Sequence, residues 1–271
     1  MMHRTELKFT AGMSTMLTIS GLFSYCQVYA HNFTPNENAA FLSLVDTMQS
    51  EIHLVQTNIA NNNVSLAQEH AENAVELLNK TWIKEIEERN KRVADELTMA
   101  LAELHNIQNT NLSQQPGDIN QIVSDIDAIL GEAVTIRIDQ EQRNNATIQA
   151  LALAGIIDAV LRNYDDAYRV GFDMTDSLQM AMNRGTDNYT LANMADYQNA
   201  QVLSLKCQEI FYDKLKSSIS ENKINFINKL ESGLLQLNHA INNKASPTYI
   251  IMIVHTQIHP NLQAAYNLQL K

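Results

Sequence analysis

The sequence predicts an all-α protein, a multi-helix bundle of long antiparallel helices. Its 271 residues include only 8 glycines and 4 prolines, and aromatic residues make up 6%. That composition favours helices over a β-sandwich. Apolar residues also recur at spacings of three and four, and residues that start or end helices separate these periodic stretches. The length permits one large domain or two small ones.

Residues 1–30 have the layout of a secretory signal peptide. Arg4 and Lys8 form a basic start, an apolar run follows over 11–23, and the sequence VYA ending at Ala30 fits the small-residue rule for cleavage. We expect cleavage after Ala30. The alternative is an uncleaved N-terminal anchor, and only in that case do we expect contact with a membrane.

The mature chain is predicted to be acidic. Cleavage would remove Arg4, Glu6 and Lys8 and leave 17 basic and 29 acidic residues, so the net charge would change from −11 to −12. Such a chain is a poor nucleic-acid binder, and it suits cations, basic partners or simple solubility. Cys207 would remain as the single cysteine, so helix packing must supply the stability. We expect an extracytoplasmic protein, secreted or associated with the cell surface.

Six N-glycosylation sequons suit a glycosylated surface outside the cytoplasm. Some would arise by chance in so asparagine-rich a chain, so the signal at any single site is weak. Their asparagines are Asn32, Asn63, Asn79, Asn111, Asn145 and Asn188.

The first predicted helix opens at Thr34 and Pro35, a cap and a first helical position, and ends at the asparagines 61–63. Its core stripe has the spacing of a helical bundle: Phe41, Val45, Met48, Ile52, Val55 and Ile59. A second helical stretch is predicted from Val64 to Asn109, with a solvated charged run from Lys84 to Arg92. Its inner side is predicted to hold Leu66, His70, Ala74, Leu77, Ile83, Ile86, Val93, Leu97, Leu101 and Leu104.

The clearest break in the chain is SQQPGD at 113–118, where Pro-Gly indicates a turn and Asp118 a helix cap. It divides an N-terminal helical hairpin unit, 31–112, from a C-terminal bundle unit, 119–271, and the two units are separate or pack as one domain. Their faint internal similarity fits either an old duplication or the features that any amphipathic helices share. Further helices are expected at 119–130, 140–170, 190–217, 223–242 and from 247 on, with an irregular region at 171–189.

The stretch from Ser246 to Pro260 combines a strong core-forming segment with the best chemical signal. Ser246 can cap a helix, Pro247 suits its first position, and Pro260 should kink or end it. His255 and His259 lie four residues apart, so they stack on one side of the helix and can bind one metal ion. The alternative is that both are packing residues. The sequence HTQIH lacks the glutamate of a zinc protease.

His53 and His70 form a second candidate pair, because antiparallel helices joined at 61–63 would bring them level. Glu51 and Glu69 lie near them in the sequence. His70 falls within the apolar stripe, so it should be at least partly buried and need a partner. The direction of the His53 side chain is open at this point, and so is the choice between a functional pair and two structural residues.

Two weaker copper signals remain. After cleavage His31 would be the first residue, and it could offer both its amine and its imidazole to one Cu(II); a chance histidine at that position is the alternative. Thioethers suit Cu(I), although methionine is also a common core residue. The methionine group is Met174, Met180, Met182 and Met194, with Asp173 and Asp176 beside it.

No motif for nucleophilic catalysis occurs in the sequence. It lacks a phosphate-binding glycine-rich loop, a GxSxG elbow and a CxxC pair. Cys207 lies within an apolar helical pattern, which predicts a buried thiol rather than a nucleophile. We therefore do not expect an enzyme.

Four segments carry a family resemblance: HNFTPNENAAFLSLVD, LAQEHAENAVELLNKTW, ADYQNAQVLSLKCQEIF and IVHTQIHPNLQAAYNLQLK. Together they resemble uncharacterised exported helical proteins of ammonia-oxidising archaea over almost the whole chain after Ala30. From about Ala159, DAYRVGFDM followed by ADYQNAQVLSLKCQEIFYDKL is similar to the extracytoplasmic helical domain of high-affinity iron permeases. The permease itself and its acidic iron motif are missing from this chain. The resemblance implies an all-α extracytoplasmic fold and hints at metals.

The sequence thus predicts a non-enzymatic exported binding protein with copper or iron as its ligand. The first candidate ligands are His255 and His259, followed by His53 and His70, with His31 in addition. The alternative is a structural or protein-interaction component of the cell surface without a metal site, in which long acidic helices bind a protein partner.

Overall fold

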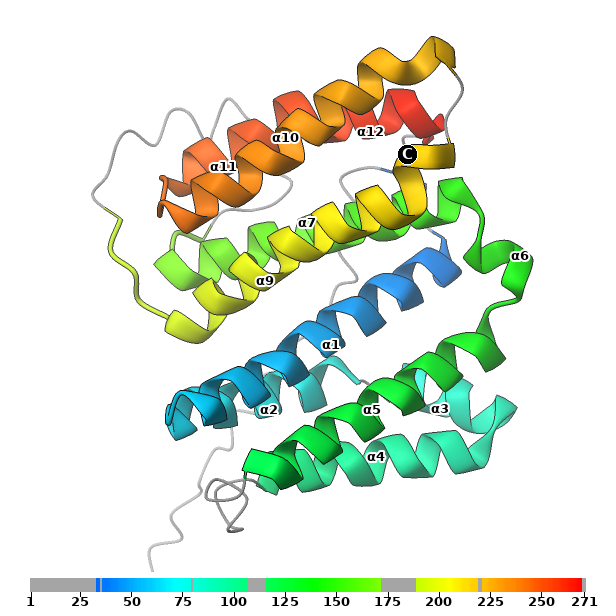
Figure 1. Ribbon diagram of the computed structural model, residues 1–271, viewed down its shortest axis with the longest axis vertical. Helices are drawn as coiled ribbons and strands as arrows, with labels where there is room; N and C mark the ends of the chain where they lie inside the picture. The colour runs from blue at the N-terminus through cyan, green and yellow to red at the C-terminus, as the bar shows by residue number, and fades with distance from the viewer. Residues whose placement is uncertain are drawn as a thin grey trace, which may run out of the picture.

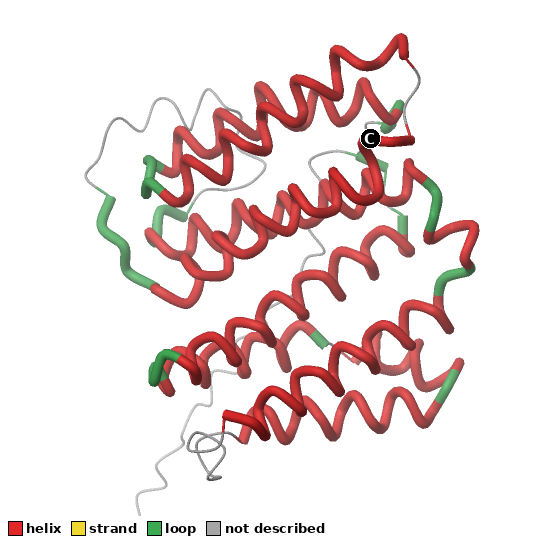
Figure 2. Tube along the Cα trace, in the orientation of Figure 1, coloured by secondary structure: helices red, strands yellow, loops and turns green. Residues whose placement is uncertain are grey.

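The structure is a computed structural model that describes residues 33–34, 36–78, 80–106, 116–171, 189–218 and 221–269. These residues are mostly helical, and no strand occurs among them (Figures 1 and 2). The predicted all-α class is therefore confirmed. The expected signal peptide, 1–30, lies outside the described residues.

Helix α1, Glu37–Ala60, lies between two groups of helices (Figure 1). On one side are four that follow it in the chain: α2 Val64–Leu77, α3 Lys80–Arg89, α4 Lys91–His105 and α5 Pro116–Arg137. On the other side α1 packs against α7 and α9, at Ala146–Tyr168 and Met194–Ile210.

The remaining elements extend or cover the α7–α9 pair. A single turn, α6 Gln140–Arg143, leads into α7. After α9 the chain continues as a π-helical turn, Phe211–Leu215, and two 3-10 turns, Lys216–Ser218 and Glu221–Lys223. Helix α10, Ile224–Asn242, packs beside α9. The closing segment consists of α11 Pro247–Ile253, the π-helical turn η7 Val254–Ile258, and α12 His259–Tyr266.

The predicted core stripe of the first helix is confirmed, because all six of its residues are buried. The predicted start of that helix is displaced by two residues. Asn36, rather than Thr34, is the N-cap, and its side-chain oxygen accepts a hydrogen bond from the Ala39 amide at 2.9 Å. The Thr34 amide instead donates to the Gln269 carbonyl at 2.7 Å, which ties the start of the described chain to its end.

The predicted second helix from Val64 to Asn109 is wrong as a single element, since it forms α2, α3 and α4. Two local signals cause the breaks. The amide of Leu78 turns back to the Val75 carbonyl at the end of α2, and Asn90 adopts extended backbone angles and caps α4. Within the charged run, Ile86 is buried on the inner face while the lysines and glutamates pair at helical spacing outside.

Two clusters of buried apolar side chains make up the core. The first joins α1 through α5, and the second joins Phe33 with α7 and the helices after it. The expected division at 113–118 overlaps the start of α5, and α5 packs on α1, α3 and α4 within the first cluster. The predicted Pro-Gly turn and the cap at Asp118 are wrong, because Pro116 and Gly117 are the first two residues of α5 and Asp118 lies in its first turn. The two clusters meet where α1 packs on α7.

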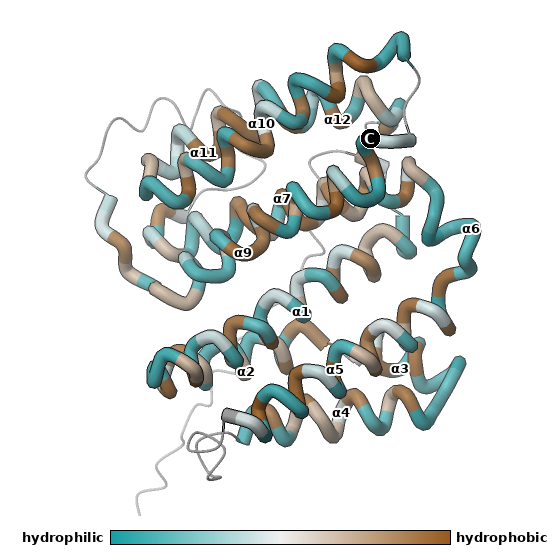
Figure 3. The backbone as a smooth tube through the Cα atoms, viewed as in Figure 1, coloured by the Kyte–Doolittle hydropathy of each residue, from teal (hydrophilic) through white to brown (hydrophobic). Residues whose placement is uncertain are grey.

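Helix α7 has the length and composition of a membrane-spanning helix, but 67% of its most apolar window is buried inside the molecule. Its neighbours α1, α9 and α12 account for that burial. In Figure 3 apolar residues recur at intervals along the helices, as expected for helices that bury one side each. The composition of α7 is thus explained by its central place in the bundle.

The closing segment confirms its predicted start, and its α-helix is interrupted before Pro260, which lies in the first turn of α12. Ser246 caps α11 by accepting a hydrogen bond from the Tyr249 amide, and Pro247 occupies the first turn. Pro260 is predicted to kink or end the helix, yet helical structure continues to Tyr266. The π-helical turn just before it, in which the His259 amide bonds to the Val254 carbonyl, accommodates the proline's missing N–H and its ring.

Candidate functional site: two buried histidine centres

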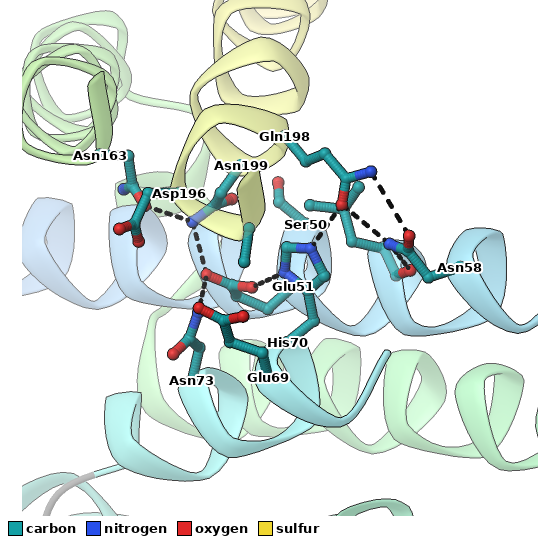
Figure 4. Close-up of polar contacts among 12 residues, drawn as sticks. Ser50, Glu51, Asn58, Glu69, His70, Asn73, Asn163, Asp196, Gln198 and Asn199 are labelled. Carbon is teal, nitrogen blue, oxygen red and sulfur yellow. Dashed lines mark hydrogen bonds and ion pairs between the residues drawn. The ribbon is translucent and has the colours of Figure 1, made fainter. Parts of the chain in front are cut away.

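His70 of α2 lies at the centre of a buried polar network between α1, α2 and α9 (Figure 4). Its side chain is fully buried, and its Nδ1 lies 2.6 Å from Oε2 of Glu51, which is 3% exposed. On the other side of the ring, Nε2 lies 2.9 Å from Oε1 of Gln198. Both ring nitrogens are therefore engaged within the protein.

Side-chain amides complete this network, which we call the Glu51–His70 centre. Asn199 donates to Oε1 of Glu51 at 2.5 Å, and Asn73 donates to the same oxygen at 3.5 Å (Figure 4). Asn58 donates both to the Leu54 carbonyl and to Oε1 of Gln198. Because buried polar groups cost free energy when they lack partners, this set of bonds fixes how the helices pack.

Burial and pairing act against each other in this centre. Burial raises the pKa of Glu51, and the hydrogen bond from His70 opposes that shift. Burial also acts to lower the pKa of His70, but the hydrogen bond and charge of Glu51 outweigh it, so the pKa of His70 is raised. Because both pKa values are raised, the pair releases its protons at a higher pH than the two free side chains would.

Further carboxylates lie at the edge of this centre. Glu69 of α2 accepts a hydrogen bond from Asn193, the N-cap of α9, at 3.1 Å. Burial, together with the charges of Asp166, Glu69 and Glu51, raises the pKa of Asp196 to about 6. The ionised form of Asp196 still predominates at neutral pH, but its surroundings make that form costlier than in an ordinary aspartate.

The structure does not bring His53 to His70. His53 is more than half exposed, and its Nε2 lies 2.7 Å from Oδ2 of Asp127 on α5. That hydrogen bond raises the pKa of His53 despite partial burial. Each histidine of this predicted pair therefore has a carboxylate partner of its own.

His255 and His259 do lie together, as their spacing predicts. Their ring centroids are 5.6 Å apart in an edge-to-face arrangement. His259 is 7% exposed, its ring contacts that of Phe33 edge-on at 5.9 Å, and its Nε2 lies 3.9 Å from Oδ1 of the fully buried Asp158 on α7. We call this group of Asp158, His255 and His259 the closing-helix centre.

The closing-helix centre has a different electrostatic character. Burial lowers the pKa of His255, which favours the neutral ring at neutral pH. Arg162, one helical turn after Asp158 on α7, has a pKa lowered by burial and raised in part by the charge of Asp158. Within the part of the chain that the structure describes, no group of three or more His, Cys, Asp or Glu residues is placed to hold a metal ion.

The remaining candidates predicted from the sequence are His31, the methionine group and Cys207. His31 lies outside the described residues, as do Met174, Met180 and Met182 with Asp173 and Asp176. Met194, the first residue of α9, is 42% exposed. Cys207 is fully buried, as predicted, and burial raises the pKa of its thiol, so the unreactive protonated form dominates.

Sequence reasoning missed several partners of these histidines. Gln198 and Asn199 lie on a helix more than a hundred residues from His70, and no local spacing links them to it. Asp158 could have been identified from the sequence, because a carboxylate within a long apolar helix needs a partner. Comparison of the chain with protein-family models, with curated proteins and with solved structures finds no match.

Proposed function

We propose that this protein is a non-enzymatic helical binding protein that acts outside the cytoplasm and binds a copper or iron ion at the closing-helix centre. The observation that carries the proposal is that the rings of His255 and His259 contact each other, and that Nε2 of His259 lies 3.9 Å from the buried carboxylate of Asp158. Imidazole nitrogen and carboxylate oxygen are ligands for both metals.

The chemistry of His255 supports this choice of site. A metal binds the neutral form of imidazole, and burial lowers the pKa of His255, so little proton release accompanies binding at neutral pH. A π-helical turn spans Val254–Ile258, and such turns are frequent at functional sites. Asp158, His255 and His259 do not by themselves form a complete ligand set. His31, the predicted first residue of the mature chain, is our candidate for a further ligand.

The extracytoplasmic location is supported by the signal-like residues 1–30 and by the resemblance to exported archaeal proteins. Two sequon asparagines within the described residues are also accessible to a glycan. Asn63 lies exposed in the turn before α2, and Asn145 is exposed at the start of α7.

A second candidate function is a structural or protein-interaction component of the cell surface. Two observations favour it. His53 and His70 each bond a carboxylate, and both ring nitrogens of His70 are already engaged within the protein. Large apolar side chains are also half exposed on neighbouring helices, with Leu205 on α9 and Leu235 on α10.

Metal content and metal titration separate the two functions. The mature protein, purified from cells grown with copper and iron, is analysed for bound metal and then titrated with Cu(II), Cu(I) and Fe(II). We expect a stoichiometric site that the double variant His255→Ala/His259→Ala loses. A matched double variant at exposed histidines, His105→Ala/His239→Ala, should bind as the wild type does. Equal binding by both double variants, or no stoichiometric binding by the wild type, would overturn the metal proposal.

A further inference from the structure

The hydrogen bonds of the Glu51–His70 centre fix the position of one proton on His70. The amide nitrogen of Asn58 must face the Leu54 carbonyl, because two oxygens cannot hydrogen-bond without a hydrogen between them. The same nitrogen donates to Oε1 of Gln198 at 3.0 Å, so this oxygen is an acceptor. Because it is also 2.9 Å from Nε2 of His70, that ring nitrogen must carry a hydrogen.

A second proton follows from the other side of the ring. Nδ1 of His70 and Oε2 of Glu51 are 2.6 Å apart, a hydrogen-bond distance that requires a proton between them. The pair therefore holds two protons, whether the second lies on the ring or on the carboxyl group. In the unfolded chain at pH 7.5 a glutamate is ionised and a histidine is mostly neutral, so the same two residues hold one.

His70 contributes much of the buried side-chain contact that holds helix α2 in place. Its fully buried residues are three alanines and His70, namely Ala67, His70, Ala71 and Ala74. An alanine buries only one methyl group, and larger apolar residues of α2 that pack against the core, such as Val64 and Leu77, are only partly buried. The N-cap residue of α2, Asn63, also makes no side-chain capping bond. His70 is therefore the largest of the fully buried side chains of α2.

The charges around the pair come from each helix that faces it. Glu69 lies beside it on α2, and Asp196 faces it from α9 (Figure 4). Asp166 of α7 adds negative charge next to Asp196. These groups are all carboxylates, so they favour the retention of the proton by Glu51 and His70 rather than its loss.

We propose that the Glu51–His70 pair is a buried proton-binding site that holds α2 against α1 and α9 while its second proton is bound, and that loosens α2 when this proton leaves at alkaline pH. Loss of the proton leaves a carboxylate facing a bare ring nitrogen, two acceptors with no hydrogen between them. The inference is independent of metal binding, since it involves none of the residues of the closing-helix centre.

The sign of the effect follows from the pKa directions of both residues. Each pKa is raised in the folded protein. The stability that the pair contributes is therefore fully present below the unfolded-state values, and it is lost as pH rises through the higher folded-state pKa of His70. Because one proton is released, the unfolding equilibrium constant should rise about tenfold per pH unit in that window, which begins near pH 6.5.

The variant Glu51→Gln tests the proposal without breaking the network. A glutamine at this position can accept the bond from Asn199 with its oxygen and donate to Nδ1 of a neutral His70 with its nitrogen. Every hydrogen bond is kept while the extra proton is no longer needed. We expect the free energy of unfolding of the wild type, measured with urea, to fall between pH 7 and 9.5. For Glu51→Gln the fall should be smaller by the contribution of about one released proton. His105→Gln, an exposed control, should follow the wild type.

A second measurement addresses α2 directly in the wild type. Amide hydrogen exchange, corrected for its intrinsic pH dependence, should become faster in α2 between pH 7 and 9.5 and remain unchanged in the core of α7. Parallel pH profiles for wild type and Glu51→Gln, or equal exchange protection of α2 at both pH values, would overturn the proposal. If Glu51→Gln fails to fold, the exchange experiment decides the question by itself.

Discussion

The two histidine centres share burial and differ in where their partners come from. His70 is bonded through both ring nitrogens to residues of α1 and α9, so three helices meet at one ring. His255 and His259 contact each other along one helical segment, and the buried carboxylate of Asp158 approaches His259 from α7. The first arrangement uses up the ligand capacity of the histidine for the sake of packing. In the second arrangement His255 lies beside His259, and burial lowers the pKa of the His255 ring.

This difference shows that a spacing along one helix predicts which side chains lie together better than a register between two helices does. The HxxxH spacing correctly predicted that His255 and His259 lie together. The register argument predicted His53 and His70 at one level, but His70 bonds Glu51 and His53 bonds Asp127 on another helix. Four predictions can break or sharpen the comparison between the centres.

The largest effect is expected from removing the ring of His70. His70→Ala leaves the Glu51 carboxylate buried without its main partner, and such losses cost about 3–5 kcal/mol in the free energy of unfolding. His53→Ala removes an exposed pair and should cost less than about 1 kcal/mol. Urea denaturation at pH 7 measures both. Similar losses for the two variants would show that His70 is no special anchor.

The next effect concerns the closing segment. A Cβ at Gly233 of α10 would lie 3.0 Å from Cγ1 of Ile258 and 3.2 Å from Cβ of Gln257, both in η7. Gly233→Ala should therefore cost about 1–3 kcal/mol and displace η7. The NMR signals of the His255 and His259 rings should shift while those of His70 stay in place. A shift at His70 of the same size would contradict the separation of the two centres.

Asp196→Asn should stabilise the protein at pH 7.5 by about 1 kcal/mol, a value reduced for the partial exposure of this side chain. The folded-state pKa of about 6 lies above the usual 3.8, so the ionised form is penalised above pH 6. The asparagine removes that penalty, and the gain should shrink as pH falls from 7 to 4. Thermal unfolding across this range measures it. A gain that stays constant with pH would show that ionisation of Asp196 is not its cause.

The smallest effect is expected at the sequons. Asn145 caps α7 through its side-chain oxygen, which accepts from the amides of Thr147 and Ile148. A glycan on the side-chain nitrogen would leave that oxygen in place, so removal of glycans from an exported protein should change the melting temperature little. Asn145→Ala should cost about 1 kcal/mol through the lost cap. A large stabilisation by the glycan would contradict the assumed exposure of both sites.

Much of the fold could be predicted because it depends on local patterns. The apolar stripe from Phe41 to Ile59, the asparagine turn after it, and the Ser246 cap all follow from spacing and side-chain chemistry within a few residues. The breaks at Leu78 and Asn90 were missed because charged residues at helical spacing continue across them. The π-helical turn before Pro260 could not be predicted from the sequence, although an interruption of the helix at this proline was expected.

The candidate site was predicted only in part, for a geometric reason. Successive residues of a helix turn by about 100°, so Glu51 and His53 point roughly 200° apart. If one faces α2, the other must face elsewhere, and in the structure it faces α5. The partners Gln198 and Asn199 could not be found at all, because they depend on how α9 crosses α1 and α2.

The most direct test of the contrast between the two centres is an NMR titration of the histidine Cε1–H signals of the wild type from pH 5 to 9.5. We expect His70 to keep its protons through pH 6.5 and to titrate only at higher pH, because Glu51 raises its pKa. His255 should titrate below pH 6.5, because burial lowers its pKa. Titration of His70 at or below the value of His255 would contradict the proposed contrast between a proton-holding centre and a neutral one.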